Sequence, residues 1–497
     1  MSARVLMFQG TGSDVGKSTL VAGLCKIAKR RGIRVAPFKP QNMSNNAAAC
    51  ADGGEIGRAQ ALQARAAGLD PCVDFNPVLL KPQSDQTAQI VVHGQVLDTL
   101  SASEYMNNKR QHLMDAVVNS FRTLCDNYDL ILVEGAGSAA EINLRERDIA
   151  NMGFARQVSA PVCLIGDIDR GGVIAAVVGT KAVIDSEDAA QIKSFIINRF
   201  RGDPRLFDDG VMAIEQLTGW PCRGVVPWLP SALKLPQEDA VVLQQGHDAD
   251  ARTRRKLTIA VPMLSRIANF DDMDPLRMEP NVELGFVPPG KPIPQDIDAI
   301  IIPGTKSSVG DLEFLRAQGW DHDIIAFARN GGRVMGICGG YQMLGQWIHD
   351  PEGIDGKPGS VPALGLLDVS TRMLPEKQTH KIQGLCLRSG TSLTGYEIHV
   401  GTTTGPDAEN PVALLDGKPD GATNITGCVE GTYLHGIFSN NAFRRWWIDD
   451  QKSGIASTLN YESAVDEELD RLANGLEACL DVDALLEDAC EPAFAPV

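Results

Sequence analysis

Short apolar runs alternate with helical stretches through the first 230 residues of the chain. The runs are too short to be helices and stop at polar or glycine-rich turns; four of them are residues 5–8, 130–133, 162–165 and 195–198. This pattern is typical of buried parallel strands joined by crossover helices. It predicts an α/β fold with a doubly wound, mostly parallel sheet over residues 1–230.

A second alternating series follows a break in the pattern. Pro227, Pro230 and Pro236 lead into a polar stretch without periodicity at 244–250, which predicts a linker over residues 231–253. Apolar runs then recur, at residues 257–261, 299–302 and 333–337. They predict a second doubly wound domain over residues 254–445.

The last segment of the chain has a different character. From Tyr461 onward, apolar residues recur at helical spacing, and 11 Asp and Glu stand against one Arg. This predicts an acidic helical tail over residues 446–497, packed on the body through its apolar face. Because the tail holds most of the net charge, that charge says little about any active site.

The chain has 497 residues, with 46 Lys and Arg against 63 Asp and Glu, so its formal charge is −17. Such an acidic chain is a poor electrostatic match for nucleic acid, and no nucleic-acid partner is expected. No apolar run reaches the roughly 18 residues of a membrane span, so no membrane partner is expected either. The 11 cysteines form no Cys-x-x-Cys pair, which favours a reducing, cytoplasmic location. None of these patterns indicates an oligomeric state.

A glycine-rich loop follows the first predicted strand and leads into an apolar helix. Backbone N–H groups and the helix dipole at such a junction favour a bound phosphate. The strict Walker pattern requires glycine where Thr11 stands, and here that glycine is one position earlier. The loop predicts ATP binding, with Lys17 reaching the phosphates and Ser18 ligating Mg²⁺; the residues expected at ATP are Gly10, Thr11, Gly12, Asp14, Gly16, Lys17, Ser18 and Thr19.

Charged residues stand after other predicted strands of this domain. Glu134 directly follows residues 130–133, where a carboxylate beside a phosphate loop is a good Mg²⁺ ligand, although an acid there also suits a helix cap. Asp52 is a weaker Mg²⁺ candidate. Lys39 is expected either to face the transferred phosphate of ATP or to be a structural lysine. Asp167 stands in a loop rich in charge and glycine, and it is a candidate for substrate contact.

The second strong signal surrounds Cys338, where an apolar strand ends at Gly-x-Cys-x-Gly and a helix follows. This is the nucleophile-elbow arrangement with Cys in place of Ser. A helix N-terminus favours the thiolate, and the Gly339 N–H is placed to serve an oxyanion. The sequence therefore predicts Cys338 as a nucleophile, which needs a base.

Two of the eight histidines are candidates for that base. His435 ends a short β-prone run, and His399 stands after a similar one. Sequence spacing alone does not choose between them.

The N-terminal half resembles the dethiobiotin synthetase-like branch of P-loop enzymes, which use ATP to activate a carboxylate as an acyl phosphate. The shared features are the phosphate loop with its shifted glycine, Lys39-Pro40 and the Glu134-Gly135-Ala136-Gly137 stretch. The resemblance implies that Asn198, after its strand, reads the adenine.

The C-terminal half resembles the class I glutamine amidotransferases. That resemblance implies that His435 is the base and that Gly304 supplies the second oxyanion N–H beside Gly339. The usual His-x-Glu of that family is broken here, because Ile437 stands in place of Glu. Either the Cys-His pair suffices or another acid orients His435; Glu397 is the candidate for orienting His435 or for contacting substrate.

Along nearly its whole length the chain resembles the cobyric acid synthase family of cobalamin biosynthesis. The distinguishing stretches are residues 40–46, 76–82, 140–144 and 148–152, and their Asn42 and Asn45 are candidates for substrate contact. The resemblance implies ATP- and glutamine-dependent amidation of the b, d, e and g carboxylates of a corrinoid, adenosylcobyrinic acid a,c-diamide. It implies Mg²⁺ with ATP, and no bound redox cofactor.

Three alternatives stay open at this point. The a,c-diamide synthases share both domains and amidate different carboxylates. CTP synthase also pairs the two domains, but it keeps the His-x-Glu that is missing here. A partitioning-type nucleotide switch usually has an extra lysine near the start of its phosphate loop, where this chain has Gly10-Thr11-Gly12. A fused glutaminase has no place in such a switch.

Overall fold

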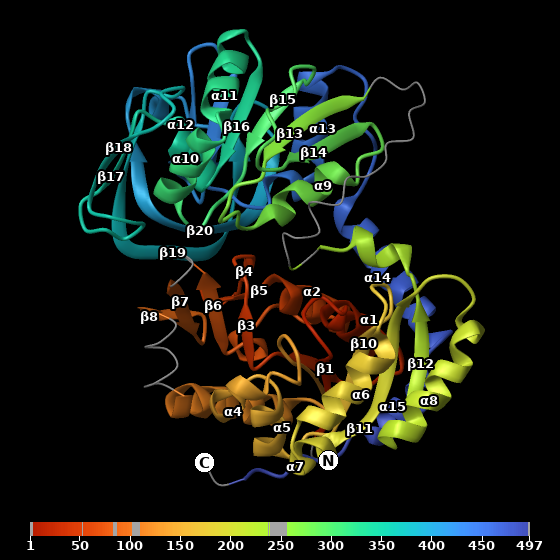
Figure 1. Cartoon of the computed structure of the whole chain (residues 1–497). Helices are drawn as coiled ribbons and strands as arrows, with labels where there is room; N and C mark the ends of the chain where they lie inside the picture. The colour runs from red at the N-terminus through yellow and green to blue at the C-terminus, as the bar shows by residue number, and fades with distance from the viewer. Residues whose placement is uncertain are drawn as a thin grey trace. The chain divides into compact units, whose positions relative to one another are not determined.

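The computed structural model describes residues 3–51, 53–82, 87–101, 110–236, 238 and 256–495. Contacts between residues divide the chain into two compact units, each with its own sheet and covering helices (Figure 1). The first unit comprises Met1–Ser44, Gly54–Glu238 and Val465–Val497, and the second comprises Asn45–Gly53 and Asp239–Ala464. The expected linker over 231–253 lies mostly outside the described residues.

The first unit is built on a six-stranded parallel sheet. Its strand order is β12-β11-β10-β1-β9-β2, and every neighbouring pair is parallel. The strands are β1 (Arg4–Gly10), β2 (Val35–Phe38), β9 (Leu130–Glu134), β10 (Val162–Asp167), β11 (Ile192–Phe200) and β12 (Cys222–Pro227). The four apolar runs of the sequence are β1, β9, β10 and β11, so the prediction of a parallel sheet is confirmed.

Both faces of this sheet are covered by helices, which is why its strands are apolar throughout. Val5 and Met7 of β1 pack toward α4 (Arg110–Asn127), α5 (Met152–Val158) and α6 (Val173–Val183). On the opposite face, Leu6 and Phe8 meet α1 (Lys17–Arg30) and α15 (Val482–Asp488). Successive side chains of β1 thus pack against the helices on opposite faces of the sheet.

A smaller mixed sheet, of order β3-β6-β7-β8, completes the first unit together with the remaining helices. Its strands are β3 (Gln41–Met43), β6 (Val78–Pro82), β7 (Thr87–Val92) and β8 (Gln95–Ser101); the other elements are β5 (Glu55–Gly57), α2 (Arg58–Ala67), α7 (Ser186–Gln191) and α8 (Asp208–Thr218). This second sheet had no counterpart among the strands expected from the sequence.

The second unit has a six-stranded sheet of order β14-β13-β15-β16-β24-β23, parallel except for the edge strand β23. The strands are β13 (Leu257–Pro262), β14 (Val282–Val287), β15 (Ala299–Ile302), β16 (Arg333–Ile337), β23 (Ala422–Thr423) and β24 (Val429–Thr432). The predicted strands at 257–261, 299–302 and 333–337 are β13, β15 and β16. The prediction of a second mostly parallel sheet is confirmed.

A further sheet of order β18-β17-β19-β21-β22, with β20 paired to β19, belongs to the same unit. Its strands are β17 (Trp347–Asp350), β18 (Gly359–Pro362), β19 (Ser370–Cys386), β20 (Ser392–Thr404), β21 (Ala413–Leu415) and β22 (Lys418–Asp420). The remaining elements are β4 (Ala47–Ala49), α9 (Asp274–Arg277), α10 (Ser308–Ala317), α11 (Trp320–Arg329), α12 (Gly339–Leu344) and α13 (Asn441–Gln451).

The C-terminal segment divides between the two units rather than forming a tail of its own. Helix α13 and the residues up to Ala464 belong to the second unit. Most of α14 (Tyr461–Glu477) and all of α15 belong to the first, where a Cβ on Gly23 would overlap Leu476 of α14. Asp488 accepts hydrogen bonds from Ser194 and Arg223 at 2.8 and 2.6 Å. These helices are therefore part of the first unit's packing.

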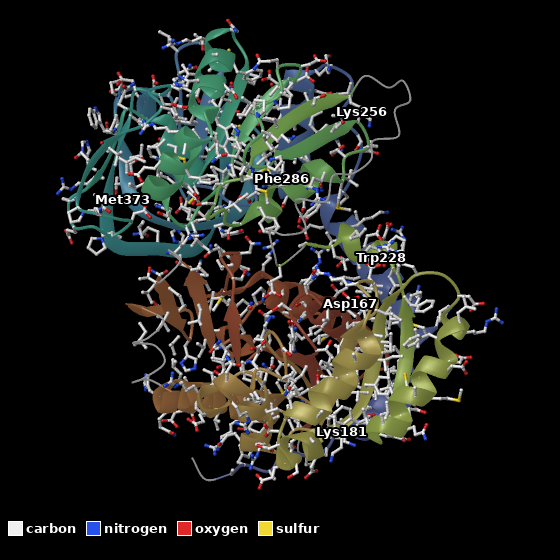
Figure 2. The ribbon with its side chains drawn as sticks, viewed as in Figure 1. Asp167, Lys181, Trp228, Lys256, Phe286 and Met373 are labelled. Atoms are coloured by element: carbon white, nitrogen blue, oxygen red, sulfur yellow. The ribbon has the colours of Figure 1, made fainter. Side chains whose placement is uncertain are left out.

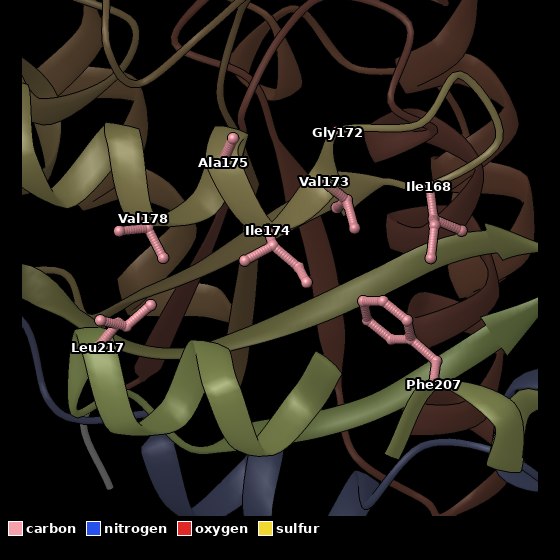
Figure 3. A pocket seen from close by; sticks show the side chains of 8 residues that line it. All are labelled: Ile168, Gly172, Val173, Ile174, Ala175, Val178, Phe207 and Leu217. Carbon is pink, nitrogen blue, oxygen red and sulfur yellow. The ribbon is translucent and has the colours of Figure 1, made fainter. Parts of the chain in front are cut away.

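An open apolar hollow of about 530 Å³ lies on the first unit between α6 and α8 (Figure 3). Its lining residues are glycine or apolar: Ile168, Gly172, Val173, Ile174, Ala175, Val178, Phe207 and Leu217. Such a lining offers no side chain that would hold a phosphate or a carboxylate, so the hollow is not a candidate for either active site. Among the described helices, none combines the length and apolar character that crossing a membrane requires.

The place of α15 in the core leads to a stability prediction. Leu485→Ala should lower the free energy of unfolding of the first unit by about 2–5 kcal/mol, the usual cost of emptying a buried leucine site. Leu485 is 1% exposed and packs near Leu6 and Phe8, whereas the control Leu206 is 81% exposed, and Leu206→Ala should cost less than about 0.5 kcal/mol. Hydrogen exchange of the β1 amides measures the effect. Equal protection in both variants would show that α15 does not stabilise the sheet.

Candidate active sites

The phosphate loop joins the end of β1, at Gly10, to the start of α1, at Lys17. Gly16 adopts a φ of +91°, and a Cβ there would overlap the Asn198 amide, so this position requires glycine. Lys17 is buried, and its Nζ donates to the carbonyl oxygens of Gly12 and Gly137 at 3.0 and 2.9 Å. The lysine side chain therefore lies folded against the loop, as a phosphate-binding lysine must.

Two residues of β11 form hydrogen bonds to this loop. Asn198 donates from Nδ2 to the Val15 carbonyl at 2.8 Å. Arg199 bridges Asp14 of the loop and Asp167 at the end of β10, both at 3.0 Å; Asp167 is labelled in Figure 2. Asp14 and Asp167 thus share one arginine, which no pattern in the sequence had marked. Adenine reading by Asn198 stays a prediction.

Five polar side chains meet beside the phosphate loop. Glu134, at the end of β9, lies 2.7 Å from Ser18 Oγ and accepts from Lys39 Nζ at 2.8 Å. Its other oxygen accepts from Gln63 at 2.6 Å. Glu238 lies 2.8 Å from the same Ser18 Oγ and 3.2 Å from the same Lys39 Nζ. The sequence predicts Ser18, Lys39 and Glu134 at this nucleotide site, but no pattern in it predicts Glu238.

Burial and opposite charge together set the ionisation of this cluster. Burial opposes the charge of Lys39, but Glu134 and Glu238 outweigh it and raise the lysine pKa. Burial likewise disfavours the ionised Glu238, yet Lys39 and the hydrogen bonds from Ser18 and Asn42 lower its pKa overall. The lysine is therefore cationic and Glu238 anionic at neutral pH.

Oxygen atoms of this cluster are the ligand type that Mg²⁺ prefers. Ser18 and Glu134 lie close enough to share one ion, which fits the magnesium site expected from the sequence. Within the described ranges, no group of three or more His, Cys, Asp or Glu is arranged to hold a metal. Asp52, the other expected ligand, lies outside the described residues. Asn42 sits at the edge of the cluster and donates to Glu238 at 2.6 Å.

In the second unit, Cys338 stands between the end of β16 and the start of α12. Its backbone has a φ of +52° and a ψ of −109°, a conformation that is strained for any residue but glycine. A Cβ on Gly340 would overlap the Ile302 carbonyl, so the turn needs small neighbours. This is the geometry of a nucleophile elbow.

His435 is fully buried beside this cysteine, just after β24. Its Nδ1 lies 2.7 Å from Oδ2 of Asp272, whose other oxygen accepts from the Gly436 N–H at 2.6 Å. Cys338 also interacts with this ring, and the cysteine Sγ lies 3.5 Å from the Ile398 carbonyl oxygen. Burial opposes a charged ring, but Asp272 and Cys338 raise the pKa of His435 to about 10. The ring is therefore protonated at neutral pH and suited to pair with a thiolate.

His399 has different surroundings. Its ring stacks on Tyr433 with the centroids 3.9 Å apart, and its Nδ1 has no hydrogen-bond partner among the described residues. Burial and the neighbouring His435 lower its pKa to about 4. A neutral ring without an acid to orient it is a poor base, so the geometry favours His435.

The acid beside His435 is not the one that the sequence suggested. Glu397 lies 3.1 Å from His380 Nε2, while Asp272 holds His435 Nδ1. Asp272 comes from a short helical turn 163 residues before His435, and no motif in the sequence marks it. Although the Glu of the His-x-Glu pattern is missing, a carboxylate, that of Asp272, contacts the His435 ring.

The two expected oxyanion glycines lie at the same edge of the sheet. A Cβ on Gly304 would lie 2.9 Å from His435 Cε1, so the absent side chain leaves room beside the imidazole ring. Gly339 follows Cys338 as the first residue of α12. Asn45 also belongs to this unit, and its buried Oδ1 makes no hydrogen bond among the described residues; its role stays a prediction.

Comparison with known proteins places both units in families. The CobQ/CobB/MinD/ParA nucleotide binding domain matches residues 6–242, and the CobB/CobQ-like glutamine amidotransferase domain matches residues 258–443. Each match covers nearly all of one of the two six-stranded sheets. The nucleotide-binding match contains the phosphate loop, and the amidotransferase match contains Cys338, His435 and Asp272.

Relatives along the whole chain are named cobyric acid synthase. The one from Hyphomonas neptunium is 60% identical over 494 residues, which cover 99% of both chains. The one from Paracoccus denitrificans is 61% identical over 97% of this chain and 98% of its own. A third, from Methylorubrum populi, is 56% identical over 98% of this chain and 99% of its own. The chain therefore belongs to the cobyric acid synthase family of cobalamin biosynthesis, as an ATP-dependent ligase with a glutamine amidotransferase domain.

Proposed function

We propose that this protein amidates the b, d, e and g carboxylates of adenosylcobyrinic acid a,c-diamide, with glutamine as nitrogen donor and ATP as energy source. The observation that carries the proposal is the 60% identity over 99% of the chain to a protein named cobyric acid synthase. The two clusters of polar residues supply the chemistry that this reaction needs.

Ammonia is released at Cys338. The thiolate attacks the side-chain carboxamide of glutamine, and the N–H groups of Gly304 and Gly339 stabilise the oxyanion. His435, held by Asp272, gives its proton to the departing ammonia and leaves a thioester. It then takes a proton from the water that hydrolyses this thioester to glutamate.

The first unit activates the carboxylate. A corrinoid carboxylate attacks the γ-phosphorus of ATP, ADP leaves, and an acyl phosphate forms. Lys17 and Lys39 neutralise the charge that builds on the transferred phosphoryl group. Ser18 and Glu134 would hold Mg²⁺, which would supply further positive charge to the phosphates. Ammonia then attacks the acyl carbon and expels phosphate, which leaves the amide. Asn42, Asn45 and Asp167 remain candidates for corrinoid contact.

The corrinoid is a substrate in this proposal, and no bound redox cofactor is required. All 11 cysteines are free thiols, which suits the reducing cytoplasm that we propose as the location.

The number of amidations separates this proposal from its nearest alternative, an a,c-diamide synthase. Purified protein with ATP, Mg²⁺, glutamine and the a,c-diamide should give four successive products, each lighter by the fixed difference between a hydroxyl and an amino group. Mass spectrometry of the corrinoids measures this. A series that stops after two steps, or no product at all, would contradict the proposed substrate.

The separation of the two chemistries predicts the behaviour of Cys338→Ser. The variant should form no product with glutamine, because a serine hydroxyl in this site is a far weaker nucleophile than a thiolate. It should keep most of its turnover with ammonium at a pH where free ammonia is appreciable, since the first unit needs only ammonia and the carboxylate. Product formation from each nitrogen source is the measurement. A folded variant that ammonium fails to rescue would show that Cys338 does more than release ammonia.

The Asp272–His435 contact predicts a change in pH dependence. In the native protein His435 stays protonated up to a pH near its pKa of about 10, so the thiolate has a cationic partner throughout the neutral range. Asp272→Asn removes the charge that raises this pKa, so the imidazolium is lost at a lower pH. Glutaminase turnover should fall about 10²–10⁴-fold, because His435 without its orienting charge loses its contribution as general acid and base. Alkylation of Cys338 should slow at pH 7, and its profile should shift to higher pH.

Two further variants complete this test. Asp298→Asn is the matched control, because Asp298 lies in the same unit but binds Lys452 and the Thr258 N–H instead. It should leave the alkylation profile unchanged. A shift in Glu397→Gln, with none in Asp272→Asn, would assign the orienting role to Glu397.

A further inference from the structure

Glu238 is the least expected member of the nucleotide site. The sequence places it in the segment read as a linker, 220 residues after Ser18. Its carboxylate nevertheless lies among the phosphate-site residues, 2.8 Å from Ser18 Oγ, 2.6 Å from Asn42 Nδ2 and 3.2 Å from Lys39 Nζ. Its side chain is 14% exposed. An ordinary linker carboxylate would stay in water, so this burial calls for an explanation.

The Ser18 hydroxyl supplies the first part of the explanation. Its oxygen lies 2.7 Å from Glu134 Oε1 and 2.8 Å from Glu238 Oε2. A serine hydroxyl has only one proton, so it can donate to only one of these two acceptors. The other contact then sets a carboxylate oxygen against a lone pair of the hydroxyl, which repels unless a cation lies between them.

These spacings match the coordination shell of magnesium. Mg²⁺ binds oxygen at about 2.0–2.1 Å with near-octahedral geometry, so neighbouring ligand oxygens lie about 3 Å apart. Ser18 Oγ has that relation to an oxygen of each glutamate. Lys39 bridges the same two carboxylates from another side, at 2.8 and 3.2 Å, and so reduces the repulsion between them.

We propose that Glu238 is a third protein ligand of the catalytic Mg²⁺, beside Ser18 and Glu134. The inference rests on the proposed use of ATP and Mg²⁺ by the first unit. The Glu238 carboxylate takes the place of one water ligand of the ion. Because Glu238 is the last residue of the segment Gly54–Glu238, the ion holds the end of that segment beside the phosphate loop. Asn42 donates to the oxygen of Glu238 that faces away from Ser18, and it thereby orients the ligand.

Manganese substitution tests this assignment without relying on turnover. The full-length protein is titrated with Mn²⁺ in the presence of a non-hydrolysable ATP analogue, and bound Mn²⁺ is followed by electron paramagnetic resonance. Loss of even an outer-shell partner typically weakens metal affinity about 10–100-fold, so Glu238→Gln and Glu238→Ala should each weaken Mn²⁺ binding at least about tenfold. In ¹⁷O-water, the Ala variant should show one more water on the ion than the native protein.

The matched control is Glu187→Gln. Glu187 is an exposed acid of α7 in the same unit, and its partner is Arg156. This variant has the same charge change and should bind Mn²⁺ like the native protein. Thermal unfolding of all variants checks that the fold is intact.

Three results would overturn the assignment. Unchanged Mn²⁺ affinity with a lower KM for the corrinoid would show that Glu238 occupies the place of the substrate carboxylate. Weaker affinity with an unchanged water number would show that its charge acts from outside the coordination shell. If the native protein itself binds no Mn²⁺ with the nucleotide, the magnesium site of the proposed function fails, and the role of Glu238 fails with it.

Discussion

Parallel strands end at a common edge, and this geometric constraint determines where both active sites lie. In the first unit the phosphate loop follows β1, and Glu134 and Asp167 are the last residues of β9 and β10. In the second, the loops after β15, β16 and β24 carry Gly304, Cys338 and His435. Residues that are far apart in the chain thus become neighbours because neighbouring strands end together.

Buried charges at both edges are held in pairs or small clusters, because an isolated charge in such a place would cost several kcal/mol. Lys39 stands between Glu134 and Glu238 in one site, and His435 stands between Asp272 and Cys338 in the other. The same pairing that stabilises these groups also sets their protonation. A cationic lysine suits a transferred phosphoryl group, and a cationic imidazole suits a thiolate.

Close backbone approach is the second requirement that the two sites share. In the phosphate loop, a side chain at Gly16 would overlap Asn198. At the elbow around Cys338, a side chain at Gly340 would overlap the Ile302 carbonyl. In the first unit this packing extends to the C-terminal helices, since α15 covers the face of β1 opposite to α4. The strand that leads into the phosphate loop is therefore supported by residues from both ends of the chain.

The sequence by itself determined the elements whose signals are local. Apolar runs identified the central strands of both sheets, and the phosphate loop and the elbow at Cys338 were visible because strand, glycine turn and helix follow one another directly. Only the tertiary structure decided which acids lie beside His435 and Ser18. Asp272 and Glu238 look like ordinary loop acids in the sequence, and they reach His435 and Ser18 across 163 and 220 residues. Such contacts depend on how strand ends and returning segments converge in space, and no local spacing encodes that convergence.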